Sequence, residues 1–226
     1  MSAVDVVQGD SREALIPSGP FAGFKANHYK LLAVDPPWHF RARTALQMTN
    51  WTSRRDAEKH YDVMGVDDIA ALPVKELAAP DAHLMLWITG PLLIEGKHLP
   101  IMKAWGFKPS SIAFTWVKLK RSIDARQLRL TVTQESDLHV GLGLTTRKNA
   151  EFCLLGRRGN AKRLSKSVRE IILSPVREHS RKPEEFYHRA RQYAAGPYLE
   201  LFSRQARPGW DAWGLETGKF DQKEAA

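Results

Sequence analysis

Four consecutive residues, Asp35-Pro36-Pro37-Trp38, are the part of the sequence best suited to chemistry. They follow the apolar run 31–34, which is typical of a buried strand. An aromatic amine such as N6 of adenine is a poor nucleophile because its lone pair is delocalised into the ring. Hydrogen bonds from that amine to the Asp35 carboxylate and to the Pro36 carbonyl, which two successive proline rings hold in place, would activate it. We therefore expect Asp35, Pro36 and Pro37 to hold such an amine, with Trp38 as its stacking face.

The same four residues also have a purely structural interpretation. In that interpretation two prolines end the strand, Asp35 caps the turn and Trp38 belongs to the core. The chemical interpretation needs an electrophile, and a sulfonium methyl donor is the simplest, since the protein then only positions and polarises the reactants. A base held in such a pocket has to leave its helix, as in base flipping.

The surrounding elements must place this motif at a strand end. Short apolar runs alternate with longer amphipathic segments, which is typical of an α/β layered fold with a mostly parallel sheet. In such folds the functional groups lie at the carboxyl ends of the strands. The sequence predicts strands over 31–34, 84–89, 112–117, 150–155, 170–173 and 198–202, helices over 66–77, 92–105 and 183–194, and long loops over 41–60 and 120–146.

Length and composition indicate one soluble globular domain. The chain has 226 residues, 43% of them hydrophobic and 26% charged, and we treat 1–226 as a single domain. Its most apolar stretch, 84–94, is too short to cross a bilayer, and its first ten residues do not resemble a signal peptide, so we expect a cytoplasmic protein. The single Cys153 excludes an internal disulfide, and no ligand set has the spacing of a zinc site, so we expect no metal.

Positive charge is concentrated in one part of the chain. The formal net charge is +9, and residues 147–191 hold thirteen Lys or Arg against five Glu and no Asp. A zone of this density suits a polyanion, because each phosphate that is neutralised releases counterions. A solvated basic surface is the alternative interpretation.

The Asp35-Pro36-Pro37-Trp38 motif resembles the signature of the N6-adenine methyltransferase family, which includes the catalytic subunit of the eukaryotic messenger RNA adenosine methyltransferase and compact bacterial and phage enzymes. The resemblance covers about residues 10–217. It implies a Rossmann-like methyltransferase fold with a circularly permuted motif order, and S-adenosylmethionine as cofactor. Similar segments follow one another in the family's order at 64–74, 84–89, 105–107, 116–118, 151–160, 176–187, 200–204 and 210–214.

The resemblance also implies which residues contact the cofactor. Asp35 would lie near the methionine ammonium, Arg158 near the methionine carboxylate and Asp10 near the adenosine. Leu215 and Glu216 stand where the eukaryotic enzyme typically has Asn-Gln, and Leu215 cannot form a hydrogen bond to the ribose. The full expected set is Asp10, Asp35, Arg158, His179, Ser180, Lys182, Glu200, Phe202, Arg204, Leu215 and Glu216.

We expect a monomeric or homodimeric enzyme that methylates N6 of adenine in DNA. DNA is favoured over RNA because the chain has no zinc finger or second domain and compact family members are mainly bacterial or phage proteins. A non-catalytic nucleic-acid-binding subunit and a methyltransferase acting on a protein or small-molecule amine are the alternatives. The expected nucleic-acid contacts are Arg41, Arg43, Arg54, Arg55, Lys118, Lys120, Arg121, Arg147 and Lys148.

Overall fold

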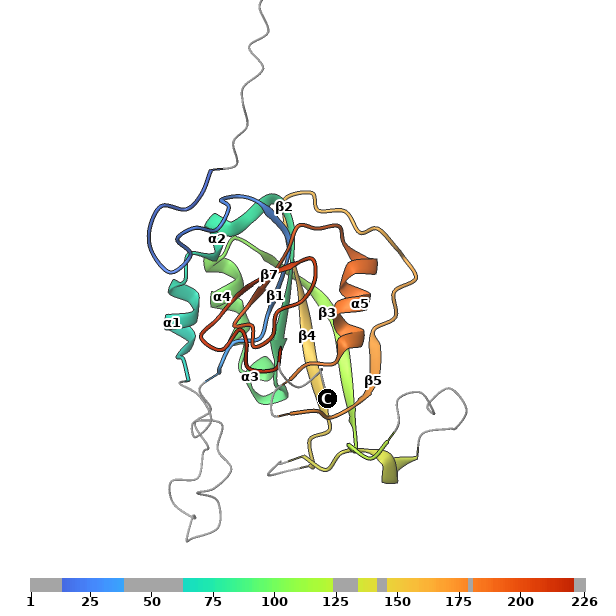
Figure 1. The fold of residues 1–226 in the computed structure, drawn as a ribbon. Helices are drawn as coiled ribbons and strands as arrows, with labels where there is room; N and C mark the ends of the chain where they lie inside the picture. The colour runs from blue at the N-terminus through green and yellow to red at the C-terminus, as the bar shows by residue number, and fades with distance from the viewer. Residues whose placement is uncertain (1–13, 39–62, 124–133, 142–145, 179–180, 222–226) are drawn as a thin grey trace, which may run out of the picture.

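A curled seven-stranded sheet forms the centre of the protein in a computed structural model (Figure 1). The structure describes residues 14–38, 63–123, 134–141, 146–178 and 181–221. The strand order is β5-β3-β4-β2-β1-β6-β7, and β4 is antiparallel to both of its neighbours while all other pairs are parallel. The strands are β1 (Tyr29–Val34), β2 (Ala78–Ile88), β3 (Lys108–Leu119), β4 (Ala150–Arg158), β5 (Ile171–Pro175), β6 (Tyr198–Leu201) and β7 (Trp210–Trp213).

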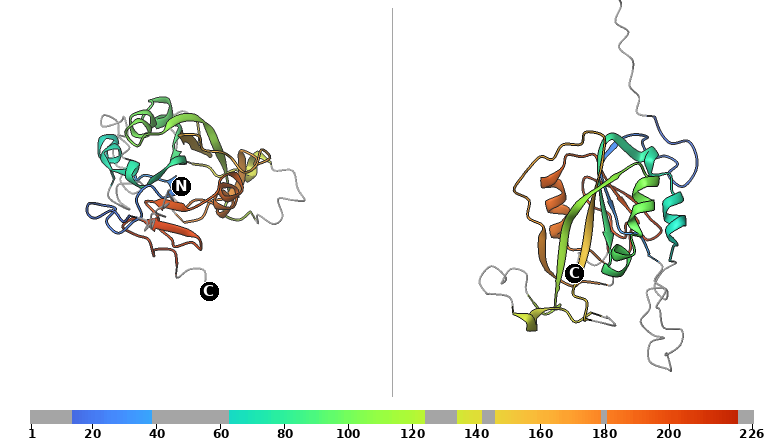
Figure 2. Two further views of the ribbon diagram at one scale, coloured as in Figure 1. Left: turned by 90° about the horizontal axis from the view of Figure 1, so that it is seen from above. Right: turned by 180° about the vertical axis from the view of Figure 1, so that it is seen from behind.

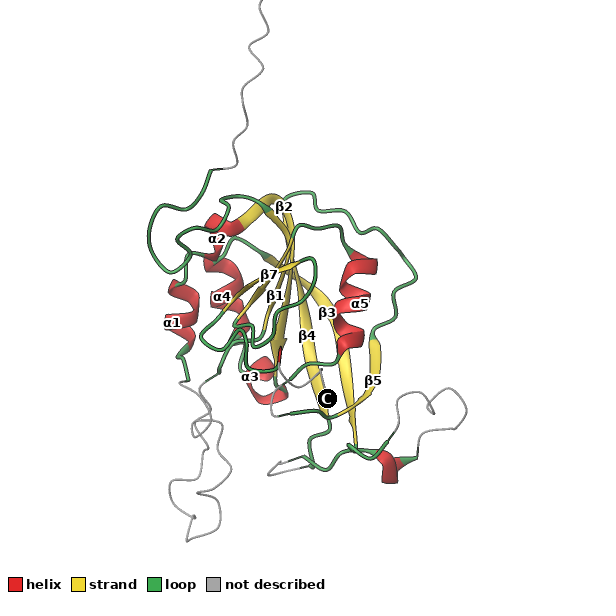
Figure 3. Cartoon of the chain, viewed as in Figure 1, coloured by secondary structure: helices red, strands yellow, loops and turns green. Residues whose placement is uncertain are grey.

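Helices cover both faces of the sheet, so the α/β expectation of a mostly parallel sheet flanked by helices is confirmed (Figure 2). In Figure 3, α1, α2 and α4 lie on one side of the sheet and α5 lies on the other. No helix that the structure describes is long and apolar enough to span a membrane. The helices are α1 (Val66–Ala71), α2 (Val74–Leu77), α3 (Gly90–Ile94), α4 (His98–Ala104) and α5 (Glu184–Tyr193), with a 3-10 turn, η3, at Glu135–Asp137.

The alternation of side chains along the strands builds two hydrophobic cores. Leu32 and Val34 of β1 pack with the helices that precede β3, whereas Leu31 and Ala33 face α5. This is the two-residue period of a strand that is covered on both faces. Three tryptophans, Trp87, Trp105 and Trp116, are buried in these cores.

Two of the expected helices are each divided in the structure. The segment 66–77 forms α1 and α2, separated by Leu72 and Pro73, because proline has no N–H to continue a helix. The segment 92–105 forms α3 and α4, separated at Gly96, whose φ of 68° favours glycine. Pro183 is the N-cap of α5, so this helix begins one residue after its predicted start at 183.

The strand order reverses between β1 and β6, and we call the space outside the carboxyl ends of these two strands the crevice. The connection that follows β1 leads to its neighbour β2, toward one edge of the sheet. The connection that follows β6 leads to its neighbour β7, toward the other edge. Ligands of open α/β sheets bind outside the carboxyl ends of the strands at such a point. Asp35 follows β1 and Phe202 follows β6, and these two strands are hydrogen-bonded neighbours.

Candidate active site

Asp35 lies at the carboxyl end of β1, where it forms an ion pair with a lysine 147 positions away. Lys182 Nζ donates to Asp35 Oδ2 over 2.6 Å, from the segment that leads into α5. The lysine side chain is only 4% exposed and the aspartate 22%. The fold therefore places two opposite charges at the crevice, with the acid as the more accessible partner.

The ion pair continues into a row of four charges. Lys182 Nζ also contacts Glu151 Oε1 at 3.0 Å, and Glu151 Oε2 contacts Lys118 Nζ at 2.7 Å. Glu151 stands at the beginning of β4, which is antiparallel, so it lies at the carboxyl ends of the neighbouring strands β2 and β3. Two carboxylates and two ammonium groups balance, which is the condition for keeping charges largely out of water.

The two carboxyl groups of this row differ in basicity. Burial raises the pKa of Asp35, against the attraction of Lys182. Burial also disfavours the charged form of Glu151, but Lys182 and Lys118 outweigh it and lower the pKa of Glu151 to about 2. The pKa of Lys182 is raised because both carboxylates surround its ammonium and outweigh its burial. Asp35 is therefore the carboxylate of this pair that takes up a proton more readily.

Trp38 lies in the core beneath this site. Its side chain is 5% exposed, and its indole N–H donates to the backbone oxygen of Trp87 over 3.0 Å. The centroid of the Trp87 ring in turn lies 5.4 Å from Lys182 Nζ. The arrangement matches the structural interpretation of Trp38. Its expected stacking role stays a prediction, because little of the ring is accessible in this structure.

The carbonyls of the two prolines already have backbone partners. Pro36 O accepts the N–H of Trp38 and Pro37 O accepts the N–H of Met64, each over 2.8 Å. These bonds fix the turn that follows β1. A carbonyl oxygen has two lone pairs, so the Pro36 oxygen keeps capacity for a second donor.

The carboxyl end of β6 brings further expected cofactor residues to the same crevice. Phe202 has φ of 59°, a conformation that is strained for a bulky residue and is concentrated at functional sites. Arg204 Nε donates to Glu216 Oε2 over 2.9 Å, and Glu216 also pairs with Lys219. Leu215 is 96% exposed, so its side chain shapes no pocket in this structure.

Hydrogen bonds from within the protein engage both oxygens of the Glu200 carboxylate. Its Oε1 accepts from Tyr187 over 2.6 Å, while its Oε2 accepts from Ser203 over 3.0 Å and from Arg207 over 2.7 Å. Burial raises the pKa of Glu200, against the attraction of Arg207. These bonds tie β6 to α5 and to the segment after β6. A direct contact of Glu200 with cofactor stays a prediction.

Arg158 does not belong to this crevice, which corrects the expectation from the resemblance. Its Nη1 donates to the carbonyls of Lys75 and Ala78, each over 2.9 Å. Along β2, Arg158 pairs with Ala82 whereas Val34 pairs with Leu86. These four positions amount to about 13 Å at about 3.3 Å per residue. Because β4 is antiparallel, its first residues and not its last ones reach the carboxyl edge.

Part of the expected nucleic-acid surface lies beside the same edge. Lys118 is at the end of β3, where it pairs with Glu151 and lies over the Trp116 ring at 4.8 Å. Arg121 donates to the carbonyl of Arg177 over 2.6 Å. Lys118 is therefore engaged in the charge row. Four other expected contacts are exposed and follow β3 or precede β4: Lys120, Arg121, Arg147 and Lys148.

Several expected site residues lie outside the described residues. These are Asp10, Arg41, Arg43, Arg54, Arg55, His179 and Ser180.

Glu151 is the one member of the charge row that sequence reasoning did not select. Its signal was a charged residue inside the apolar run 150–155, a setting in which an acid is rarely buried without a partner. Within the part of the chain that the structure describes, no group of three or more His, Cys, Asp or Glu could hold a metal ion.

Comparison with known proteins finds relatives along nearly the whole chain. The mycoplasma Type II methyltransferase M.MunI is 26% identical over 201 residues, covering 83% of this chain and 77% of the relative. The N6-methyladenosine RNA methyltransferase MTA1 of Cryphonectria parasitica is 27% identical over 206 residues, and the human N(6)-adenine-specific methyltransferase METTL4 is 25% identical over 209 residues.

The fraction of each relative's own length that this chain spans differs among them. The chain spans 54% of the fungal protein and 38% of the human one, while 87% and 85% of the chain itself are covered. The sequence profile of the MT-A70 family matches residues 29–216, from the start of β1 to the glutamate that pairs with Arg204. The chain belongs to the MT-A70 family.

Proposed function

We propose that this protein transfers a methyl group from S-adenosylmethionine to the exocyclic N6 amine of adenine in DNA. The observation that carries the proposal is the contact of Asp35 with Lys182 at the carboxyl ends of β1 and β6. The relatives named as adenine or adenosine methyltransferases support the reaction type.

The crevice fits the amino-acid end of S-adenosylmethionine. That end carries an ammonium and a carboxylate, and Asp35 and Lys182 offer the complementary charges side by side. Glu216, held by Arg204, offers carboxylate oxygens to ribose hydroxyls. When bound, the cofactor supplies a sulfonium-activated methyl group.

The chain itself contributes hydrogen-bond acceptors and a shielded environment. The Asp35 carboxylate and the second lone pair of the Pro36 carbonyl accept protons of the adenine amine, which increases electron density on N6. Once N6 carries the methyl group as a fourth substituent it is positively charged and must lose a proton, and Asp35 is the better acceptor of the two acids because its pKa is raised while that of Glu151 is lowered to about 2. The buried Lys182 keeps Asp35 oriented toward the crevice.

DNA is the first candidate substrate and RNA is the second. The chain spans 77% of the mycoplasma Type II methyltransferase but only about half of the fungal RNA methyltransferase. RNA is the second candidate, because that fungal protein is as similar in sequence, with 27% identity against 26%. Both substrates suit the basic side chains of Lys120, Arg121, Arg147 and Lys148.

The experiment is transfer of labelled methyl from S-adenosylmethionine to double-stranded DNA, single-stranded DNA and RNA in parallel, followed by nucleoside analysis. We expect label in N6-methyldeoxyadenosine. Label only in N6-methyladenosine would replace DNA by RNA, and absence of label from every polymer, with cofactor bound, would contradict the proposed activity. Asp35→Asn is the control, because it retains the shape of the side chain without its charge.

A further inference from the structure

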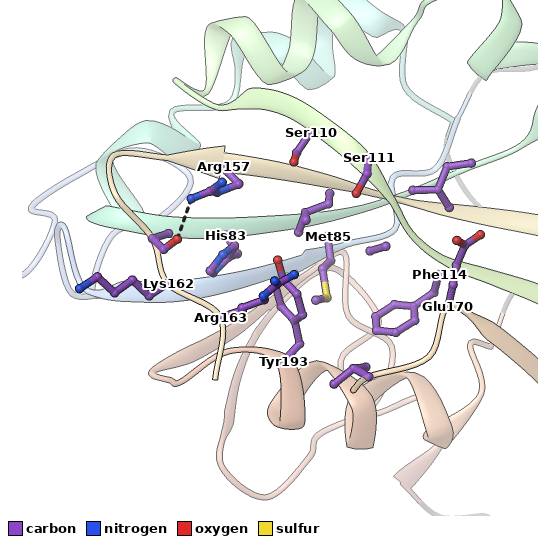
Figure 4. Close-up of a pocket in the computed structure, with 15 residues that line it drawn as sticks. His83, Met85, Ser110, Ser111, Phe114, Arg157, Lys162, Arg163, Glu170 and Tyr193 are labelled. Carbon is purple, nitrogen blue, oxygen red and sulfur yellow. Dashed lines mark hydrogen bonds between the residues drawn. The ribbon is translucent and has the colours of Figure 1, made fainter. Parts of the chain in front are cut away.

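A pocket of about 740 Å³ opens on the α5 face of the sheet, toward the edge at which β2 begins (Figure 4). Its walls come from the first half of β3, the end of β4, the segment 161–170 and the last residue of α5. None of its lining residues belongs to the charge row or to the crevice at the ends of β1 and β6. Its volume is in the range of pockets that hold small organic ligands, about 300–1,000 Å³.

One end of this pocket is strongly cationic. Arg157, Lys162 and Arg163 line it, and Figure 4 shows them on the side away from Glu170. Arg157 uses one N–H on the carbonyl of Ala161 over 3.0 Å, and a guanidinium has four more to offer. Among the residues that the structure describes, Lys162 and Arg163 have no ion pair. The segment 157–169 contains six Lys or Arg and no Asp or Glu, so this end is suited to an anion.

A buried histidine beside the cations has one ring nitrogen that forms no hydrogen bond among the described residues. His83 is 3% exposed, and its Nε2 has no hydrogen bond within the described part of the chain. Burial and the nearby Arg157 lower the pKa of His83 to about 4, so the ring is neutral near pH 7. Buried polar atoms of folded proteins are nearly always satisfied by protein, water or ligand. A ligand group in the pocket would supply the missing partner.

The middle of the pocket is suited to a flat ring. The His83 ring packs edge-to-face against Tyr193 with 5.1 Å between centroids, and Met85 and Phe114 supply apolar surface. At the far end, Glu170 accepts from the Thr115 hydroxyl over 2.9 Å and would repel a second anion. The anionic group of a ligand is thus directed to the Arg157 end and its ring to the middle.

We propose that this pocket binds a nucleoside monophosphate, with the phosphate on Arg157, Lys162 and Arg163 and the base against His83 and Tyr193. The phosphate accepts charge-assisted hydrogen bonds from the guanidinium groups. A polar atom of the nucleotide satisfies Nε2 of His83. This site is separate from the proposed methyl-transfer site and does not depend on that function.

The test is calorimetric titration of the full chain with adenosine 5′-monophosphate, adenosine and inorganic phosphate, each in the presence of saturating S-adenosylhomocysteine. S-adenosylhomocysteine occupies the proposed cofactor site, so the binding that remains belongs either to this pocket or to the target-adenine site at Asp35, and the variants below separate the two. We expect the monophosphate to bind at least about tenfold more tightly than either fragment, because both ends of the pocket are then used. Loss of monophosphate binding under these conditions would overturn the proposal.

Two charge reversals in one segment locate the binding. Arg163→Glu should weaken the monophosphate at least about tenfold, whereas Lys166→Glu, an exposed neighbour outside the pocket, should change its affinity less than about twofold. Equal effects of both variants would indicate diffuse attraction to the basic segment, and no effect of Arg163→Glu would place the ligand elsewhere. Either result overturns the assignment.

His83→Phe tests the unpaired nitrogen directly. The variant keeps a planar ring against Tyr193 and removes Nε2, so the melting temperature of the free protein should stay or rise while the monophosphate binds at least about fivefold more weakly. An unchanged affinity in this variant would overturn the proposal. Should the variant fail to fold, the Arg163→Glu measurement decides.

Discussion

Replacing Lys182 by Met is the sharpest perturbation of the site. The ammonium lies 2.6 Å from Asp35 and 3.0 Å from Glu151 and is 4% exposed, so Lys182→Met leaves two largely buried carboxylates without their shared cation. Removing one partner from a buried ion pair costs about 3–5 kcal/mol. For a chain of this size, each kcal/mol lowers the melting temperature by about 2–4 °C, so we expect a decrease on the order of 10 °C.

The assay for Lys182→Met combines urea unfolding with calorimetric titration of S-adenosylmethionine. Glu151 keeps Lys118 as a cation in Lys182→Met, so the double variant Lys182→Met, Glu151→Gln removes the repulsion between the two carboxylates but also the partner of Lys118; its loss of stability should differ from the sum of the single losses by about 1–3 kcal/mol, the usual coupling between residues in contact. Cofactor affinity should fall in both variants and should not recover in the double one, since neither offers a cation to the carboxylate. A free energy of unfolding of Lys182→Met within about 1 kcal/mol of the wild type, together with unchanged cofactor affinity, would refute the reasoning.

Three further perturbations test separate parts of the account. The lowered pKa of Glu151 stabilises the native state by about 3 kcal/mol above pH 5, and this stabilisation is lost as pH falls from about 4.5 to about 2. In Glu151→Gln the free energy of unfolding should therefore depend less on pH across this range, which urea unfolding midpoints would show. The raised pKa of Asp35 changes stability with pH in the opposite direction, but Asp35 is present in both the wild type and Glu151→Gln. Arg158→Met should destabilise by about 1–3 kcal/mol through its two lost carbonyl bonds while the S-adenosylmethionine dissociation constant stays the same; a large rise in that constant would return Arg158 to the cofactor site. Trp38→Phe should destabilise by a similar amount because the Trp87 carbonyl loses its donor, and an unaltered melting temperature would show that this bond contributes nothing.

Six of the strands were located from sequence because each contains a short apolar run, but β2 and β3 begin six and four residues before their predicted starts, where polar residues interrupt the apolar pattern. β7 was missed, since Trp210–Trp213 is four residues long and contains Asp211, which leaves no periodic signal. Asp211 is bonded to Tyr29 OH, a contact across 182 positions that only the fold creates. The division of 66–77 at Pro73 was visible in the sequence, and the helical period outweighed it in the prediction.

The candidate site shows the same limits more clearly. Asp35 was identified because a strand-end acid before two prolines is chemically suggestive on its own. The contact of Lys182 with Glu151 depends on the direction of β4, and apolar periodicity does not encode whether a strand runs parallel or antiparallel. That same direction removes Arg158 from the site and brings Glu151 into it.

The central claim is that methyl transfer takes place at the carboxyl edge of the sheet, at Asp35. Its most direct test is single-turnover transfer from S-adenosylmethionine to an adenine-containing oligonucleotide, comparing Asp35→Asn with Arg158→Met, which changes the opposite edge. We predict that Asp35→Asn lowers the transfer rate about a hundred- to a thousandfold, as expected when a preorganised hydrogen-bonding group at the reacting atom is removed, and that Arg158→Met stays within about threefold of the wild type. Comparable rates for the two variants would contradict the account.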